Sequence, residues 1–342
     1  MADALRIAAA FSTSLAVTWC LVPIAIRMAA RTDFYDHPGG YKEHARSTPY
    51  LGGLAVTTGF LVAAIIFGWA SDEVLVLVLG VLVLLAVGTA DDRVGLGIIP
   101  RILIEVGVAA AVWFCGFGWD LFSSGALDFL FTIAWVVGLI NAFNLMDNLD
   151  GATATVAAAS AAGAGGLALA QGGVLLAAVG FSLAGACAGF LPHNLAKPAK
   201  IFLGDGGSMP VGFAIAVITM TIPFGSGSLI AFALACLVVA VPILDMAAVI
   251  ISRRQRGVGV FVGGRDHMTH RLFRYIDSER GVSAVLFAAQ GSLCGLAVVL
   301  IETSRGVLVV AVSAFSLVLA ALALAYLETL ATGIPKPGRG DT

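Results

Sequence analysis

Charged side chains are scarce in this chain: Asp, Glu, Lys and Arg make up 12% of its 342 residues. Soluble domains carry about 25% charged residues, whereas hydrophobic residues reach 59% here and the mean hydropathy is +0.99. A soluble core of this size has no use for so much apolar surface. The composition therefore predicts an all-α polytopic membrane protein that lies in a lipid bilayer.

Cysteine is also sparse, and its five copies stand singly inside apolar runs. Neither a Cys-x-x-Cys pair nor a Cys/His spacing indicates a zinc site or a disulfide framework. Basic tracts interleaved with aromatic residues are missing as well, and the net charge is −2. The sequence therefore predicts that nucleic acid is not a partner.

What the chain does have is a series of long apolar runs. A membrane-spanning helix needs about 20 mostly apolar residues, and eleven runs qualify as candidates. They cover residues 7–29, 50–70, 74–90, 99–118, 125–143, 152–170, 173–191, 207–222, 227–251, 283–301 and 306–327. The first run is too long for the core of a cleavable signal, so we expect it to be retained as a helix. Ala and Gly dominate 152–191, which suits close helix packing in lipid.

Lys and Arg are distributed unequally between the two sides of this arrangement. If the loop 30–49 lies inside, the inside segments and their flanks hold every Lys and Arg except Arg6 and Arg305. Cytoplasmic loops carry such an excess, so we predict the N-terminus outside and the C-terminus inside. The inside loops also hold nearly all the unusual polar residues, which predicts an active site at the cytoplasmic face.

The most informative inside segment is 141–151, which reads Asn-Ala-Phe-Asn-Leu-Met-Asp-Asn-Leu-Asp-Gly between two apolar runs. Its carboxylates and carboxamides stand at a membrane boundary, where polar side chains by default indicate a functional site. The alternative is a solvated turn, because Asn, Asp and Gly are ordinary turn residues. A turn needs only two or three of them, so the functional interpretation is favoured.

Two further inside segments carry acids. Asp91 and Asp92 end an apolar run and repel each other unless a cation lies near, which favours Mg²⁺ coordination or a raised pKa. Neutralisation by Arg93 is the simpler alternative. Residues 204–208, Gly-Asp-Gly-Gly-Ser, precede an apolar run and resemble a phosphate-cradling turn, in which Asp205 would need a bridging metal.

Basic residues and histidines gather in two more inside segments. In the loop 36–53, Lys42 suits contact with a phosphate, although a solvated lysine would obey the inside rule equally well. The paired glycines of 52–53 suit a tight helix entry or the close approach of a ligand. Residues 253–272 form the longest and most basic segment, with His267, His270 and Arg271 at its end. Phosphate contact is favoured over zinc there because no cysteine accompanies them.

Acids within the predicted spans are few. Asp245 is expected to form a structural pair with a neighbouring Arg or amide, a catalytic role being the alternative, and Glu105 is the other acid placed within a span. A transporter would spread carboxylates along a path through the membrane, so transport is the weaker reading. Acids, amide-rich turns and a basic loop on one face instead suit an enzyme that handles a diphosphate and a lipid phosphate.

Four motifs now resemble one family, in order and on one face. They are Asp-Asp-Arg-x-Gly-Leu at 91–96, Asn-Ala-Phe-Asn-x-x-Asp-x-x-Asp-Gly at 141–151, Phe-x-Gly-Asp-x-Gly-Ser at 202–208, and His-x-x-His-Arg-Leu at 267–272. Together they look like the polyprenyl-phosphate N-acetylhexosamine-1-phosphate transferases (the MraY/WecA group), over residues 36–275. Eleven spans and the short histidine run look more like the WecA-type branch than like the phospho-N-acetylmuramoyl-pentapeptide transferases, which remain the alternative.

The resemblance implies an activity and its partners. The family transfers a sugar 1-phosphate from a UDP-N-acetylhexosamine to undecaprenyl or another polyprenyl phosphate in a prokaryotic plasma membrane. It releases UMP, uses Mg²⁺ or Mn²⁺, and begins the assembly of a lipid-linked cell-envelope glycan. A homodimer is compatible with this family.

Residue roles follow from the matched motifs. Asp205 and Asp147 are implied as metal ligands, and Asp91, Asp92 and His267 as catalytic residues. The substrate-binding residues would be Lys42, Asn144, Asp150, Phe202, His270 and Arg271, with Asp150 and Phe202 gripping uracil.

Three positions depart from the family's pattern. The family usually has Gly where Asn148 stands, often has a third His where Thr269 stands, and often has Asp where Gly264 stands. The first departure affects the backbone of the nucleotide loop, and the other two affect a loop that helps to select the sugar.

Overall fold

The computed structural model is almost entirely helical, as the composition predicts. It describes residues 1–36, 47–68, 72–224, 228–259, 264, 266–303 and 305–333. The helices are α1 (Ala2–Thr32), α2 (Gly52–Gly68), α3 (Asp72–Val94), α4 (Ile98–Phe114), α5 (Gly125–Met146), α6 (Ala152–Ala170), α7 (Val174–Asn194), α8 (Asp205–Thr221), α9 (Ser228–Val238), α10 (Ala240–Gln255), α11 (Met268–Ile276), α12 (Glu279–Ile301) and α13 (Gly306–Gly333). Two short strands, β1 (Tyr35–Asp36) and β2 (Thr48–Pro49), pair antiparallel beside this bundle.

Helices occur at the predicted spans, but not all of them are long enough to be counted as crossings. Within the described ranges, seven helices are long and apolar enough to cross a membrane, or eight if α9 and α10 form one broken span. The helices α2, α4 and α8 have 17 residues each, about 26 Å at 1.5 Å per residue. A bilayer core is about 30 Å thick, so the predicted number of eleven crossings remains a prediction.

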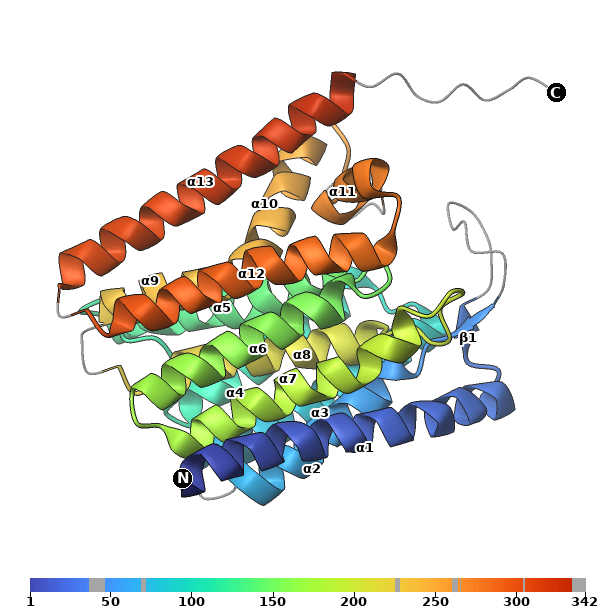
Figure 1. Cartoon of the computed structure of the whole chain (residues 1–342), viewed down its shortest axis with the longest axis horizontal. Coiled ribbons are helices and arrows are strands. Elements are labelled where there is room, and N and C mark those ends of the chain that lie inside the picture. Colours follow the sequence, from blue (N-terminus) through green and yellow to red (C-terminus); the bar gives the residue numbers. More distant parts are fainter. Residues whose placement is uncertain are drawn as a thin grey trace.

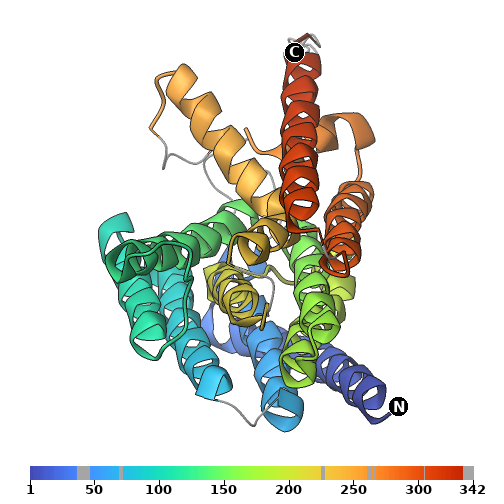
Figure 2. The same ribbon diagram turned by 90° about the vertical axis from the view of Figure 1, so that its left-hand side faces the viewer.

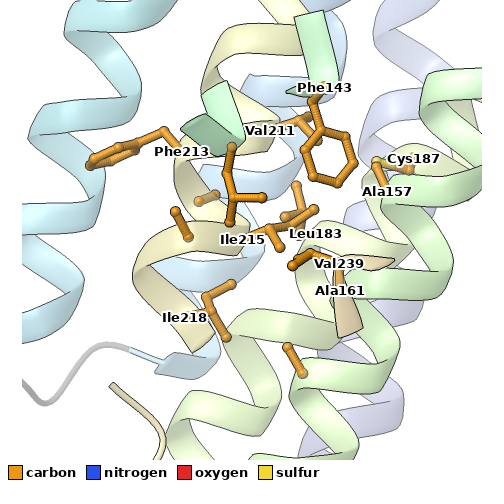
Figure 3. Close-up of a cluster of buried hydrophobic side chains, with 14 of the residues drawn as sticks. Phe143, Ala157, Ala161, Leu183, Cys187, Val211, Phe213, Ile215, Ile218 and Val239 are labelled. Carbon is orange, nitrogen blue, oxygen red and sulfur yellow. The ribbon is translucent and has the colours of Figure 1, made fainter. Parts of the chain in front are cut away.

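The helix α8 forms the centre of the bundle. Every residue from Gly206 to Met220 is buried, and Figure 3 shows Val211, Phe213, Ile215 and Ile218 of this helix in a buried cluster with side chains of neighbouring helices. Such a helix meets protein on all sides, which explains why it is apolar all round.

Small residues bring α6 and α7 together, as their composition predicts. A Cβ added to Gly180 of α7 would lie 2.9 Å from the Cα of Gly165 in α6, closer than real Cβ contacts allow. Glycine at these positions lets the two backbones touch, and the resulting packing replaces the lipid that would otherwise lie between them.

The predicted continuous helix at 227–251 is wrong. The chain breaks at Val239, where α9 and α10 meet with a bend of 78°. Pro242 has no N–H to donate to the carbonyl of Val238, and a proline there interrupts the helix. Gln290 of α12 supplies the missing partners: its Nε2 donates to the oxygens of Leu237 (3.0 Å) and Val238 (2.8 Å), while its Oε1 accepts from the N–H of Val241 (3.0 Å).

The break directs α10 away from the main bundle, whereas α12 returns to pack against α6. Figure 2 shows α10 and α13 projecting from the group formed by α1 to α8. In Figure 1 the N-terminus and β1 lie at opposite ends of the bundle. The predicted inside segments meet near β1. Hydrogen bonds there join Asp92 to Gly206 and Asn148 to Thr269.

Candidate active site

The start of α8 is held by a carboxylate from α3. Asp92 accepts hydrogen bonds from the backbone N–H groups of Asp205 (3.0 Å) and Gly206 (3.1 Å), one at each oxygen. The first N–H groups of a helix lack intrahelical partners, and the helix dipole favours an anion there. Gly204, with φ of 72°, turns the chain into the helix. The glycine-rich turn does begin a helix, but the side chain of Asp92 occupies its amides, so these two N–H groups are not open to a substrate phosphate.

The paired glycines at the start of α2 let this helix pack against the start of α8. The N–H groups of Gly52 and Gly53 donate to the carbonyl oxygens of Phe202 (3.0 Å) and Leu203 (2.8 Å). A Cβ on Gly53 would lie 2.3 Å from the carbonyl carbon of Gly206. These glycines therefore let the entrances of α2 and α8 touch, and their amides bind the chain itself rather than a ligand.

Arg101 of α4 links two of the predicted acids. Its Nη1 lies 2.9 Å from Oδ2 of Asp91 and 3.3 Å from Oδ2 of Asp205. The other oxygen of Asp91 accepts from the N–H of Leu96 at 2.6 Å. A guanidinium thus lies between carboxylates from α3 and α8, whose repulsion it reduces. The alternative partner, Arg93, donates to the carbonyl oxygen of Asp33 instead.

Two residues of the predicted nucleotide loop, Asn144 and Asp147, lie beside Asp205. Nδ2 of Asn144, at the end of α5, donates to Oδ1 of Asp205 (2.7 Å) and to Oγ of Ser208 (3.1 Å). Burial and the nearby Asp205 carboxylate raise the pKa of Asp147 to about 7, although hydrogen bonds from the Thr153 side chain and the Gly204 backbone favour its ionised form. The acids at 91, 92, 147 and 205 therefore form one cluster, as expected from their order on one face.

The two predicted uracil residues, Asp150 and Phe202, have different surroundings. Asp150 lines a cavity of about 200 Å³ together with Lys197 and Glu279, whose side chains form an ion pair of 2.9 Å. The ring of Phe202 lies 6.0 Å from that of Tyr50. Their joint grip on uracil remains a prediction. Lys42 lies outside the described residues.

His267 stands directly before α11 and is oriented from α10. Its Nδ1 lies 2.9 Å from Oδ2 of Asp245, whose Oδ1 accepts from the N–H of Met268 at 2.6 Å. Both side chains are almost fully buried. Asp245 therefore forms the predicted structural pair, with a histidine and an amide rather than an arginine. It fixes the imidazole so that Nε2 is the nitrogen left to face another group.

A second carboxylate, that of Asp266, ties the segment before α11 to the end of α10. Asp266 forms a bidentate pair with buried Arg253 (2.9 and 3.0 Å) and also contacts Arg256 (2.6 Å). Burial opposes ionisation, but the hydrogen bonds from Arg253 hold the pKa of Asp266 at about 2. A Cβ on Gly264 would lie 2.8 Å from Oδ1 of Asp266 and 3.5 Å from Nη2 of Arg253. Asp266 thus occupies the place that an acid at 264 would use.

His270 and Arg271 follow on the first turn of α11. The rings of His267 and His270 lie 6.4 Å apart, and Arg271 is 4% exposed. Thr269, between them, donates its hydroxyl to Oδ1 of Asn148 in the nucleotide loop. Among the described residues, no three His, Cys, Asp or Glu side chains gather as a metal site, and the preference for phosphate over zinc at these histidines remains a prediction.

Sequence reasoning missed the role of Arg101 and a buried pair beside it. Asn141 donates to Glu105, which also lies 3.7 Å from Arg101. The signal was an arginine four residues before an acid within an apolar run, since such residues share a helix face. Glu105 and Asp245, the two acids within predicted spans, are thus both paired with neighbouring side chains.

Sequence comparison with known proteins supports the family that the four motifs resemble. Residues 74–223 match glycosyl transferase family 4. The decaprenyl-phosphate N-acetylglucosaminephosphotransferase of Mycobacterium tuberculosis is 30% identical over 315 residues, which cover 80% of this chain and 78% of that protein. The undecaprenyl-phosphate alpha-N-acetylglucosaminyl 1-phosphate transferase of Escherichia coli is 26% identical over 288 residues, 80% of this chain and 78% of that protein. The chain thus belongs to glycosyl transferase family 4, the polyprenyl-phosphate N-acetylhexosamine-1-phosphate transferases.

Proposed function

We propose that this membrane protein transfers N-acetylglucosamine 1-phosphate from UDP-N-acetylglucosamine to undecaprenyl or another polyprenyl phosphate and releases UMP. The activities named for its relatives support the reaction. The observation that carries it is the meeting of Asp91, Asp205 and Arg101, from three helices, beside Asn144. The lipid-linked product would begin a cell-envelope glycan.

The donor set fits a divalent cation, and we propose Mg²⁺, with Mn²⁺ as a substitute. The acids outnumber the described cation beside them, and the raised pKa of Asp147 reflects their crowding. Mg²⁺ is commonly bound through one or two carboxylates and completed by substrate phosphates. Asp205, with Asp147 beside it, is the ligand we assign. When bound, Mg²⁺ would neutralise the diphosphate and the leaving UMP.

The remaining roles in the reaction are assigned to residues of the chain itself. We assign the lipid phosphate to Asp91, because Arg101 joins it to Asp205, whereas Asp92 holds the start of α8. Attack of the lipid phosphate oxygen on the sugar-linked phosphorus forms one P–O bond and breaks the bond to UMP. Asn144 orients Asp205, and His267, held by Asp245, presents Nε2 to a phosphate.

The activity is tested by UMP release from purified protein with undecaprenyl phosphate, Mg²⁺ and a panel of UDP-N-acetyl sugars. We expect release with UDP-N-acetylglucosamine, loss on chelation, and loss in Asp205→Asn with folding unchanged. Asp120→Asn, an exposed acid between α4 and α5, is the matched control and should keep wild-type turnover. An active Asp205→Asn protein would contradict the metal assignment, and no UMP from any sugar would contradict the reaction.

Orientation is part of the proposal. We place the acid cluster at the cytoplasmic face, the N-terminus outside and the C-terminus inside, on the distribution of Lys and Arg. Labelling of single cysteines introduced at position 120 and in the segment 334–342 of intact cells tests it. Reagents that cannot cross the membrane should reach only position 120.

A further inference from the structure

Two residues that depart from the family's pattern touch each other across 121 positions of sequence. The hydroxyl of Thr269 donates to Oδ1 of Asn148, and Nδ2 of Asn148 donates to the carbonyl oxygen of Leu145 at 2.7 Å. Both ends of the Asn148 amide are therefore used, which fixes its orientation. Thr269 has no exposed surface, so water does not compete for its hydroxyl.

This contact attaches α11 to the nucleotide loop. On its other side, α11 is held by Asp245, which accepts from the N–H of Met268. Successive residues of a helix are rotated by about 100°. Fixing Met268 from α10 and Thr269 from the nucleotide loop therefore sets the directions of His270 and Arg271, the next two residues.

The contact also explains why two departures occur together. Glycine at 148 has no side chain to accept a hydrogen bond, so the Thr269 hydroxyl would lose this buried acceptor. Conversely, removal of the hydroxyl would leave Oδ1 of Asn148 without this donor. Each residue satisfies the polar group that the other brings, as buried polar groups require.

We propose that Asn148 and Thr269 are a positioning pair for the UDP-sugar: their hydrogen bond fixes the spacing between the nucleotide loop and the His270–Arg271 face of α11. The inference rests on the proposed function. Neither residue takes part in the chemistry, so their loss weakens binding of the UDP-sugar more than it slows the reaction. Losing one neutral hydrogen bond corresponds to a change of roughly 3- to 10-fold in binding.

The test compares Thr269→Val, Thr269→Ser, Asn148→Gly and the double variant Asn148→Gly/Thr269→Val in the UMP assay. We expect Thr269→Val to raise KM for the UDP-sugar about 3- to 10-fold with kcat within about twofold. Thr269→Ser keeps the hydroxyl and should restore KM. The double variant should be no worse than Asn148→Gly alone, because Thr269→Val then removes a contact that is already lost. Thr221→Val, whose hydroxyl bonds only within α8, is the matched control.

A second measurement does not need the activity. Amide hydrogen exchange of residues 268–276 should be faster in Thr269→Val than in wild type and unchanged in Thr221→Val. An active wild type whose KM is unaffected by Thr269→Val, or fully additive effects in the double variant, would overturn the positioning pair. A wild type that releases no UMP would instead overturn the proposed function, while faster exchange would still support the attachment of α11.

Discussion

Gln290 supplies the hydrogen bonds that Pro242 removes from the helix opposite it. Without Pro242 the N–H of residue 242 would donate to Val238, and that carbonyl instead accepts from Nε2 of Gln290 at 2.8 Å. At membrane depth no water can take this place, and unsatisfied backbone groups are costly. The broken span therefore depends on a single buried amide from α12.

Gln290→Leu is expected to destabilise the protein strongly. It leaves the carbonyl oxygens of Leu237 and Val238 and the N–H of Val241 without partners, each at a cost of about 1–3 kcal/mol. Thermal unfolding in detergent should show a clearly lower midpoint. Ser292→Ala, an exposed residue whose hydroxyl bonds its own helix, should leave the midpoint unchanged, and a stable Gln290→Leu protein would contradict this role.

Asp92→Ala is expected to loosen the start of α8. Loss of a helix cap costs about 0.5–2 kcal/mol, and here two N–H groups lose their acceptor. Asp92→Asn retains one acceptor oxygen, so its unfolding midpoint should fall between those of wild type and Asp92→Ala. Equal midpoints for all three proteins would show that the cap contributes nothing.

An acid moved to position 264 is expected to compensate for the loss of Asp266. Asp266→Asn leaves buried Arg253 poorly paired and should lower the unfolding midpoint, because an uncompensated buried charge is costly. Adding Gly264→Asp should recover part of the loss, since a Cβ there lies near Nη2 of Arg253. Gly264→Asn in the same background is the control, and recovery with Asn as well would argue against charge pairing.

The raised pKa of Asp147 predicts that the free energy of unfolding of the metal-free protein depends on pH. Its pKa is about 7 in the folded state and near 3.8 when unperturbed, so between these values the folded state holds a proton that the unfolded state has lost. Stability should therefore fall as pH rises from about 4 to about 7. Chemical unfolding across this range should show a smaller fall in Asp147→Asn, and an identical dependence would contradict the shift.

Sequence patterns predicted the positions of the helices and the gathering of acids better than the connections between them. Apolar runs show where helices lie, but 227–251 is apolar throughout and conceals its break, for which Pro242 was the one local signal. The four motifs predicted that the acids meet. The contact of Arg101 with Asp91 and Asp205, and that of Asn148 with Thr269, depend on how distant helices pack, which local periodicity does not encode.

The Asp92 contact also imposes an order on assembly. The partners of Asp92 lie 113 residues further along the chain, so during synthesis its carboxylate emerges while α8 has yet to be made. Until then Asp92 at the end of α3 lacks the two N–H groups that bind it, whereas its neighbour Asp91 can already meet Leu96 and Arg101. A nascent chain stopped before residue 205 should consequently be the form most exposed to quality-control proteases.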